Sequence, residues 1–353
     1  MPASAASSAS RRARSRPSGR SRSTRPTRAA DRPPQPDIYE EVTNRIIAEL
    51  EQGVFPWARP WNSSKATTDG GAFALPRNPT TGNCYTGINV LLCWVAMASR
   101  GYVSNLFLTY RQAQSVGAQV RRGEASIAIV KTGTFTPKGE CEAARAEDRD
   151  PQAVPFLKTH RVFNAEQIDG LPDELTALPP PPGLSRTDAR VRAILDGLAC
   201  RVVHGTPEAC YVPATDTIRL PSPEQFGGDV GGWASVASHE AVHATGAASR
   251  LDRDLTGAFG SPAYGKEELI AEMGAAFVCA SFGIAPQVRH ADYLGAWLRV
   301  LRSDSRCIVR AASAAGRAAD YLFDVAGEAG SAGDRGDGAG TRGCALPVER
   351  EDD

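Results

Sequence analysis

Two histidines and a glutamate in the segment HEAVH, residues 239–243, could carry out metal-dependent chemistry. His239 and His243 are four residues apart, so on a helix both imidazoles lie on one face and can bind one metal ion. Glu240 then lies beside that ion, where a carboxylate can accept a proton from a metal-bound water. This pattern predicts zinc-dependent hydrolysis, most often of a peptide bond. The alternative is a buried helix whose histidines only satisfy hydrogen bonds in the core.

A zinc hydrolase uses three protein ligands and leaves the fourth position for water. The pattern HExxHxxGxxH would place a third histidine at position 249, which is Ser249. The helical segment 266–284 instead offers Glu267, Glu268 and Glu272. We predict Glu268 as the third ligand and Glu272, four residues later, as the acceptor of the ring N–H of a ligand histidine. Alternatively, all three are solvated carboxylates at the start of a helix.

Other elements must position this centre. Apolar residues flank the HEAVH motif, and Gly246 is suited to end its helix. Residues 191–205 predict a helix followed by a strand, and residues 209–221 predict a hairpin ahead of the metal-binding helix. A strand in that place could line the cleft, where an extended peptide substrate could add as one more strand.

Length and composition predict two domains plus tails, and the mixture of helical and strand patterns along the chain predicts the α+β class. The chain has 353 residues, of which 42% are hydrophobic, and its formal net charge is zero. No apolar run approaches the length of about 20 residues that spans a bilayer, so we expect a soluble protein without a membrane partner. The eight cysteines form no CxxC pair, which indicates reduced thiols in the cytoplasm.

The sequence divides into five parts. Residues 1–36 are a disordered basic arm with nine arginines and one aspartate, either a solvated tail or a segment attracted to nucleic acid. The two domains span residues 37–172 and 187–325, and a Pro-rich linker of residues 173–186 joins them. Residues 326–353 form an acidic, Gly-rich tail that we expect to be disordered.

The first domain combines helices, strands and loops that contain aromatic residues. Helical spacing covers residues 38–53 and 88–98, and alternating apolar residues predict a strand at 126–130. We expect the polar insertion 141–154 to be disordered.

Aromatic rings beside cations suit single-stranded nucleic acid, because rings stack on bases while cations neutralise phosphates. Loop tryptophans are as often packing residues, so this interpretation stays open. The candidate DNA-binding residues are Trp57, Arg59, Trp61, Tyr85, Asn89, Arg111, Arg121, Arg122 and Lys131, and the wider set also holds Lys65 and Tyr110.

Several ordered motifs resemble the ArdC antirestriction family, which is carried on plasmids and in phage-like elements and also fused to conjugative primases. In the first half these are a PWxxPW-like segment ending at Trp61, then TGNCYTGIN at 81–89, LTYRQAQ at 108–114, VRRGE at 120–124 and VFNAEQIDGL at 162–171. In the second half they are DTIRLP at 216–221, HEAVHATG at 239–246, SRLDRDL at 249–255 and YGKEELIAEMGAAF at 264–277. The resemblance covers about 290 residues, and several motifs in order are more specific than any one.

The resemblance implies a first domain that binds single-stranded DNA and a second, zincin-like metallopeptidase domain. It implies zinc ligands at His239, His243 and Glu268 and a catalytic acid/base at Glu240, whereas the DNA-binding candidates rest on residue type alone. Three functions remain open: a DNA-binding antirestriction protein with a zinc peptidase centre, a DNA-binding protein with structural zinc, and a regulatory peptidase that acts on a host protein and docks through its first domain.

Overall fold

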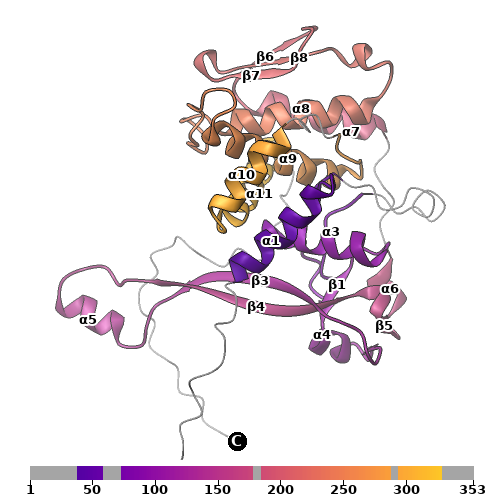
Figure 1. Cartoon of the computed structure of the whole chain (residues 1–353), viewed down its shortest axis with the longest axis vertical. Helices are drawn as coiled ribbons and strands as arrows, with labels where there is room; N and C mark the ends of the chain where they lie inside the picture. Colours follow the sequence, from indigo (N-terminus) through magenta and orange to yellow (C-terminus); the bar gives the residue numbers. More distant parts are fainter. Residues whose placement is uncertain (1–37, 59–72, 178–183, 288–292, 328–353) are drawn as a thin grey trace, which may run out of the picture. The chain divides into compact units, whose positions relative to one another are not determined.

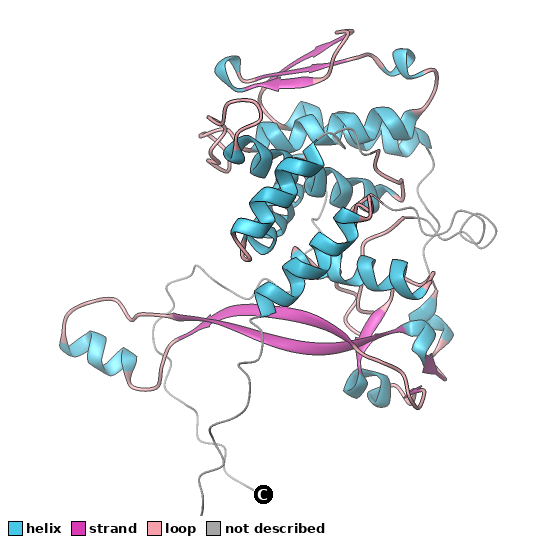
Figure 2. Cartoon of the chain, in the orientation of Figure 1, coloured by secondary structure: helices cyan, strands magenta, loops and turns pink. Residues whose placement is uncertain are grey.

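The computed structural model describes residues 38–58, 73–177, 184–287 and 293–327. These described residues belong to one compact unit (Figure 1). Helices and strands are mixed along it, as the predicted α+β class requires (Figure 2). The predicted basic arm, the candidate residues Arg59 and Trp61, and almost all of the predicted tail lie outside the described residues.

A three-stranded antiparallel sheet of order β1-β4-β3 is the frame of the N-terminal half. Its strands are β1 (Phe107–Thr109), β3 (Ile127–Phe135) and β4 (Val154–Asn164). β3 and β4 form a long hairpin, paired from Ile127 opposite Val162 to Phe135 opposite Val154. The strand predicted at 126–130 is therefore confirmed, and it continues to Phe135.

The segment that connects β3 to β4 is helical in part. It contains α5 (Glu140–Ala146), and Arg149 after this helix forms ion pairs with Glu140 at 2.5 Å and Glu147 at 2.6 Å. The expected disorder of residues 141–154 is therefore wrong, because local hydrogen bonds and ion pairs order a segment that has few apolar residues.

Two helices pack in the same half. α1 (Ile38–Glu51) buries Val42, Ile46 and Leu50 at the predicted helical spacing. α3 (Ile88–Arg100) is apolar on most sides and packs against β3. Short elements complete the half: α4 (Tyr110–Ser115), β2 (Gln119–Val120) paired with β5 (Ile168–Asp169), the 3₁₀ turn η1 (Ala165–Gln167) and α6 (Asp173–Thr176).

The C-terminal half places helix α8 between a small sheet and helix α9 (Figure 1). The sheet has the order β6-β8-β7, in which β8 is parallel to β6 and antiparallel to β7. The predicted hairpin is thus present, with β7 at an edge. The elements are α7 (Leu184–Gly197), β6 (Arg201–His204), β7 (Cys210–Val212), η2 (Pro213–Thr215), β8 (Thr217–Leu220), η3 (Pro223–Phe226), α8 (Val230–Thr245), α9 (Pro262–Phe282), α10 (Leu294–Ser303) and α11 (Cys307–Val325).

Helix α9 begins earlier than the sequence pattern indicated. Ser261 caps it by accepting a hydrogen bond from the Tyr264 N–H at 3.1 Å, and Pro262 stands at its first position. The helix ends at Gly283, whose φ of 70° suits glycine. Because the start is at Pro262, the glutamates of this helix lie beyond its first turn.

One hydrophobic core continues through both halves. The ring of Trp57, from the loop after α1, lies 5.6 Å from that of Trp297 in α10, and the ring of Trp94 in α3 lies 5.9 Å from that of Phe277 in α9. Thr43 also donates a hydrogen bond to the Ser305 carbonyl at 2.5 Å. The two halves therefore share one hydrophobic core. The Pro-rich linker between them had suggested two separate domains.

Candidate metal centre and nucleic-acid residues

Helix α8 carries both histidines of the HEAVH motif. It begins after Asp229, whose carboxylate accepts a hydrogen bond from the Gly232 N–H at 2.8 Å, and ends at Gly246. Most residues from Gly232 to Thr245 are buried, so the helix lies inside the fold. His239 and His243 are one turn apart and share a face, as their spacing predicted.

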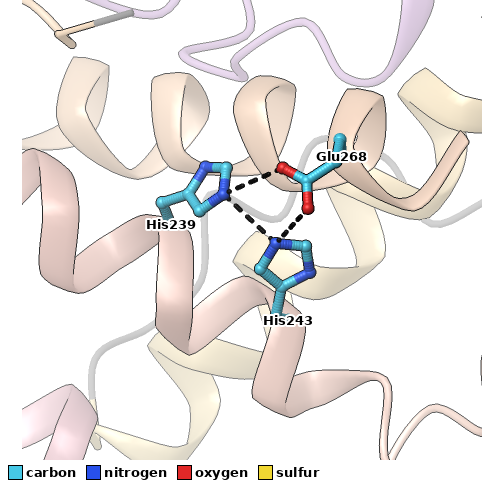
Figure 3. Close-up of side chains that lie close together, drawn as sticks. All are labelled: His239, His243 and Glu268. Carbon is cyan, nitrogen blue, oxygen red and sulfur yellow. Dashed lines mark hydrogen bonds and ion pairs between the residues drawn. The ribbon is translucent and has the colours of Figure 1, made fainter. Parts of the chain in front are cut away.

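Glu268 of helix α9 completes a three-residue group with these histidines (Figure 3). The Nε2 atoms of His239 and His243 are 3.1 Å apart, and each lies 3.5 Å from one oxygen of Glu268. Ligands at about 2.0–2.1 Å from a tetrahedral zinc ion are about 3.3 Å from each other. The three side chains therefore fit a divalent metal ion in both size and donor type.

Buried negative charge also fits a cation at this place. Glu240, Glu267, Glu268 and Glu272 are each at most 7% exposed. Buried carboxylates are costly unless they are paired or bind a metal. The alternative of solvated carboxylates at a helix start is therefore wrong, because α9 turns all three of its glutamates inward.

Glu267 holds the second histidine in place, a role that the sequence analysis missed. Its Oε1 lies 3.2 Å from His243 Nδ1. Arg253, from the loop after α8, donates to both oxygens of Glu267 at 3.1 and 2.8 Å and to the Val242 carbonyl at 2.7 Å. An acceptor at Nδ1 leaves Nε2 of His243 available for a metal ion. In the sequence, the two arginines of the SRLDRDL segment were the feature that could have indicated this role of Glu267.

Glu272 is close to the other histidine. Its Oε1 lies 3.9 Å from His239 Nδ1, on the ring edge opposite the nitrogen that faces Glu268. This position suits the predicted role of Glu272 as the acceptor of the His239 ring N–H, and that role stays a prediction. Ser249, where a third histidine would stand in the three-histidine pattern, is exposed in the loop after α8.

Two carboxylates raise the pKa of His243. Burial by itself lowers the pKa of His243, but hydrogen bonds with Glu267 and Glu268 raise it to about 10. Burial would raise the pKa of Glu268, whereas hydrogen bonds with His239 and His243 lower it. These contacts therefore favour the protonated form of His243, and a metal ion held at its Nε2 would compete with that proton.

Glu240 lies between its helix and the small sheet. Its side chain is 5% exposed, and α8 packs against β7 and β8. Burial first, and then the charge of Glu240, raise the pKa of Cys210 on β7. This places the carboxylate near an edge strand.

A group of aromatic rings adjoins the metal-site glutamate. Tyr264 precedes Glu268 by one turn of α9, and its hydroxyl lies 3.2 Å from that of Tyr293. Phe259, 81% exposed, contacts both tyrosine rings at inclined angles, with ring centroids 5.3 Å from Tyr264 and 5.9 Å from Tyr293. Burial, then the contacts with Tyr293 and Glu268, raise the pKa of Tyr264, so its phenol remains a hydrogen-bond donor.

Two of the DNA-stacking candidates are packed into the fold. Trp57 is fully buried between the rings of Phe55 and Trp297, so the prediction that it stacks on bases does not agree with this structure. Tyr85 is half-buried, donates its hydroxyl to the Phe107 carbonyl at 3.0 Å and packs its ring on that of Phe107.

Asn89 has a structural role. Its side-chain amide donates to the Val130 carbonyl at 2.7 Å and accepts from the Val130 N–H at 2.8 Å. Asn89 thereby pairs with the backbone of Val130 on the free edge of β3, as a neighbouring strand would. The predicted DNA contact of Asn89 does not agree with this arrangement, because both ends of its amide are already engaged.

The four candidate cations within the described residues are exposed. Arg121 is in a turn, where it pairs with Glu124 at 2.9 Å and Asp169 at 3.4 Å. Arg122 follows it, Arg111 lies in α4, and Lys131 lies on β3. Each of these four remains a candidate for contacting phosphate.

Comparison with known proteins identifies both halves. Residues 36–163 match the N-terminal domain of anti-restriction factor ArdC, and residues 189–314 match a zincin-like metallopeptidase. Together with the fold and the site, these matches define a two-domain protein with an ArdC-type N-terminal domain and a zincin-like C-terminal domain. The Uncharacterized protein y4eC of Sinorhizobium fredii is 38% identical over 299 residues, which are 83% of this chain and 94% of y4eC.

The chain belongs to the ArdC family of antirestriction proteins. The metal-free crystal structure of antirestriction ArdC protein from plasmid R388 matches with a TM-score of 0.68 at 37% identity, covering 82% of this chain and 98% of that chain. Its Mn(II)-bound structure matches with a TM-score of 0.66 at 36% identity, which together with the zincin-like domain indicates a divalent metal here. DNA primase TraC of Escherichia coli is 36% identical over 81% of this chain, but this chain covers 27% of the primase.

Proposed function

We propose that this protein binds single-stranded DNA through its N-terminal half and carries a zinc-dependent, peptidase-like centre in its C-terminal half. Its role would be the protection of incoming mobile DNA from restriction. The observation that carries the enzymatic part is the group of His239, His243 and Glu268, with Glu240 next to it in α8. The DNA-binding part is supported by family membership and by the relative named as a DNA primase.

We propose that His239, His243 and Glu268 hold the ion, with Glu267 and Glu272 orienting the two imidazoles. Zinc in such a site supplies Lewis acidity and lowers the pKa of water. The carboxylate of Glu240 would accept a proton from the attacking water and deliver it to the leaving amine. The Tyr264 phenol could donate a hydrogen bond to the developing oxyanion, since it stays protonated beside Glu268.

A peptide substrate has a place to bind at the sheet edge. β7 is an edge strand with α8 beneath it, so an extended peptide could pair with β7 and pass Glu240. Glu240 also favours an enzyme over a structural zinc site, because a structural zinc ion needs no general base. A regulatory peptidase that acts on a host protein would use the same geometry.

The enzymatic proposal is tested by metal content and by Glu240. Purified protein should contain about one zinc ion per chain by mass spectrometry, and Glu268→Ala should lose it. If Glu272→Ala loses zinc while Glu268→Ala keeps it, the two roles are reversed.

Glu240→Ala should retain zinc and DNA binding but lose hydrolysis of a peptide library. Antirestriction activity that survives this substitution unchanged would show that hydrolysis is not how the protein protects DNA.

We further propose that the functional units correspond to residues 37–172 and 187–325, and that the protein works in the cytoplasm. None of the helices in the described stretches is long and apolar enough to cross a membrane. Within those stretches the cysteines are free thiols, which suits a reducing compartment.

A further inference from the structure

The distal part of the β3–β4 hairpin exposes aromatic and basic side chains on one face. Residues opposite each other on antiparallel strands share a face, and so do alternate residues along a strand. Lys131 pairs with Lys158, and Phe135 pairs with Val154. Phe156 lies between Lys158 and Val154 on the same face. We call the surface of Lys131, Phe135, Phe156 and Lys158 the hairpin face.

Its aromatic rings are open to solvent. Phe135 is 51% exposed, and its ring centroid lies 6.3 Å from that of Phe156, which is partly exposed. Among the described residues four large hydrophobic side chains are exposed, and the facing pair of Phe135 and Val154 accounts for two of them. Grouped exposed apolar side chains indicate a binding surface rather than chance exposure.

Its charges are arranged for an anion. Lys131 lies directly opposite Lys158, and like charges in that position destabilise a sheet. The Nζ of Lys158 lies 5.2 Å from the centre of the Phe156 ring. Neither strand contains an aspartate or glutamate, and His160, two residues after Lys158 on β4, lies on the same face. A negatively charged ligand would relieve this repulsion.

We propose that the hairpin face is the surface on which single-stranded DNA lies, a step that rests on the proposed DNA binding. Phe135 and Phe156 stack on two bases, and Lys131 and Lys158 contact the phosphates beside them. Flat rings flanked by cations are what an unpaired strand requires, because a duplex keeps the faces of its bases stacked. This assigns the stacking role to two phenylalanines in place of Trp57 and Tyr85, which the fold packs inward.

The test is fluorescence anisotropy of labelled oligothymidine with the full chain. Phe135→Ala and Phe156→Ala should each weaken binding about tenfold, since a stacked base is worth roughly 1–3 kcal/mol. Lys131→Gln with Lys158→Gln should reduce the slope of log affinity against log salt by about 1.4. Phe259→Ala, which removes an even more exposed ring in the other half, and Arg219→Gln on β8 are controls that should bind as the wild type does.

Ultraviolet crosslinking to an iodouracil oligonucleotide adds a direct readout. Crosslinks to Phe135 or Phe156 support the assignment even where a variant folds poorly.

Wild-type affinity in Phe135→Ala and in the double lysine variant overturns the assignment of the hairpin face while leaving the proposed DNA binding intact. A wild-type chain that does not bind the oligonucleotide overturns the proposed function itself. Equal weakening of duplex and single-strand binding overturns stacking, and tighter binding of an RNA of the same sequence overturns DNA as the ligand.

Discussion

Arg253 and Glu267 show how a single contact sets the state of a metal ligand. Burial would raise the pKa of Glu267, but hydrogen bonds with His243 and Arg253 lower it, so the carboxylate stays charged at His243 Nδ1. Arg253 is in turn fixed by Thr245, whose hydroxyl accepts from it at 2.8 Å. The tight packing here explains Gly246, where a Cβ would lie 2.9 Å from Leu255 Cδ2 and 3.0 Å from both Arg253 Nη2 and the His243 carbonyl oxygen.

We expect Glu267→Gln to weaken metal binding by about 10- to 100-fold, because the neutral amide no longer raises the basicity of the His243 imidazole. Zinc affinity measured by competition with a chromogenic chelator checks this. Glu166→Gln, an exposed glutamate in the other half, is the control. Unchanged affinity in Glu267→Gln would show that His243 needs no acceptor at Nδ1.

Asp216 gives a pH-dependent contribution to stability. It lies in the turn before β8 and accepts hydrogen bonds from Arg250 at 3.1 Å and from the Tyr211 hydroxyl at 2.8 Å. The Arg250 guanidinium, which is largely buried, holds the pKa of Asp216 below its ordinary value of 3.8. Because the folded-state pKa is lower than the unfolded one, the contribution is present above about pH 4 and is lost as the pH falls further.

Asp216→Asn should therefore lower the free energy of unfolding at pH 7 by about 1 kcal/mol, a modest value because the Asp216 side chain is 40% exposed. Asparagine tolerates the positive φ of 43° at this position, so the turn itself is kept. Urea unfolding at pH 7 and at pH 3 checks the prediction. The difference between wild type and variant should shrink at the lower pH, and a constant difference would contradict it.

At the scale of elements, the metal site depends on how closely α8 and α9 approach. Gly274 faces Val242 at the crossing of these helices, and a Cβ there would lie 2.8 and 2.9 Å from the two Val242 methyl carbons. The branched valine side chain has little freedom to move away. The same crossing brings Glu268 of one helix to the histidines of the other.

Gly274→Ala should destabilise the fold by about 1–3 kcal/mol and weaken zinc binding, because the added methyl group pushes the helices apart. Gly265→Ala in the same helix is the matched control, since its Cβ would meet Ala296 at 3.6 Å, an ordinary contact. That variant should be neutral or slightly stabilising through higher helix propensity. Thermal unfolding and chelator competition distinguish the two, and equal behaviour would contradict this account of the crossing.

At the scale of the whole molecule, the shared core links the two halves. Trp57, Trp94, Phe277 and Trp297 bring rings from both halves into one interior. Side chains in a continuous core lose their partners together when either half unfolds. The halves should therefore unfold as one cooperative unit, although their sequences match different domains.

Trp297→Ala should lower stability by about 3–5 kcal/mol in a single transition that includes the β3–β4 hairpin. Calorimetry combined with hydrogen exchange of the hairpin peptides checks this. Adding zinc should raise the same transition temperature and protect both halves, because the ion binds only the folded state. Two separate transitions, with only the C-terminal one responding to zinc, would contradict the shared interior.

The sequence alone was sufficient for features that depend on nearby residues. The spacing of His239 and His243 places both on one helical face whatever surrounds the helix. The ordered motifs of both halves identified the ArdC family, and alternating apolar residues located β3.

The tertiary structure decided whatever depends on distant partners. Glu267, Glu268 and Glu272 look alike in the sequence, and the packing of α9 against α8 gives each a different neighbour at the two histidines. Trp57 is buried because Trp297, far along the chain, covers it. Phe135 and Phe156 became candidates for DNA binding only through strand register, since periodicity gives each strand a face but does not say which residues meet across the hairpin.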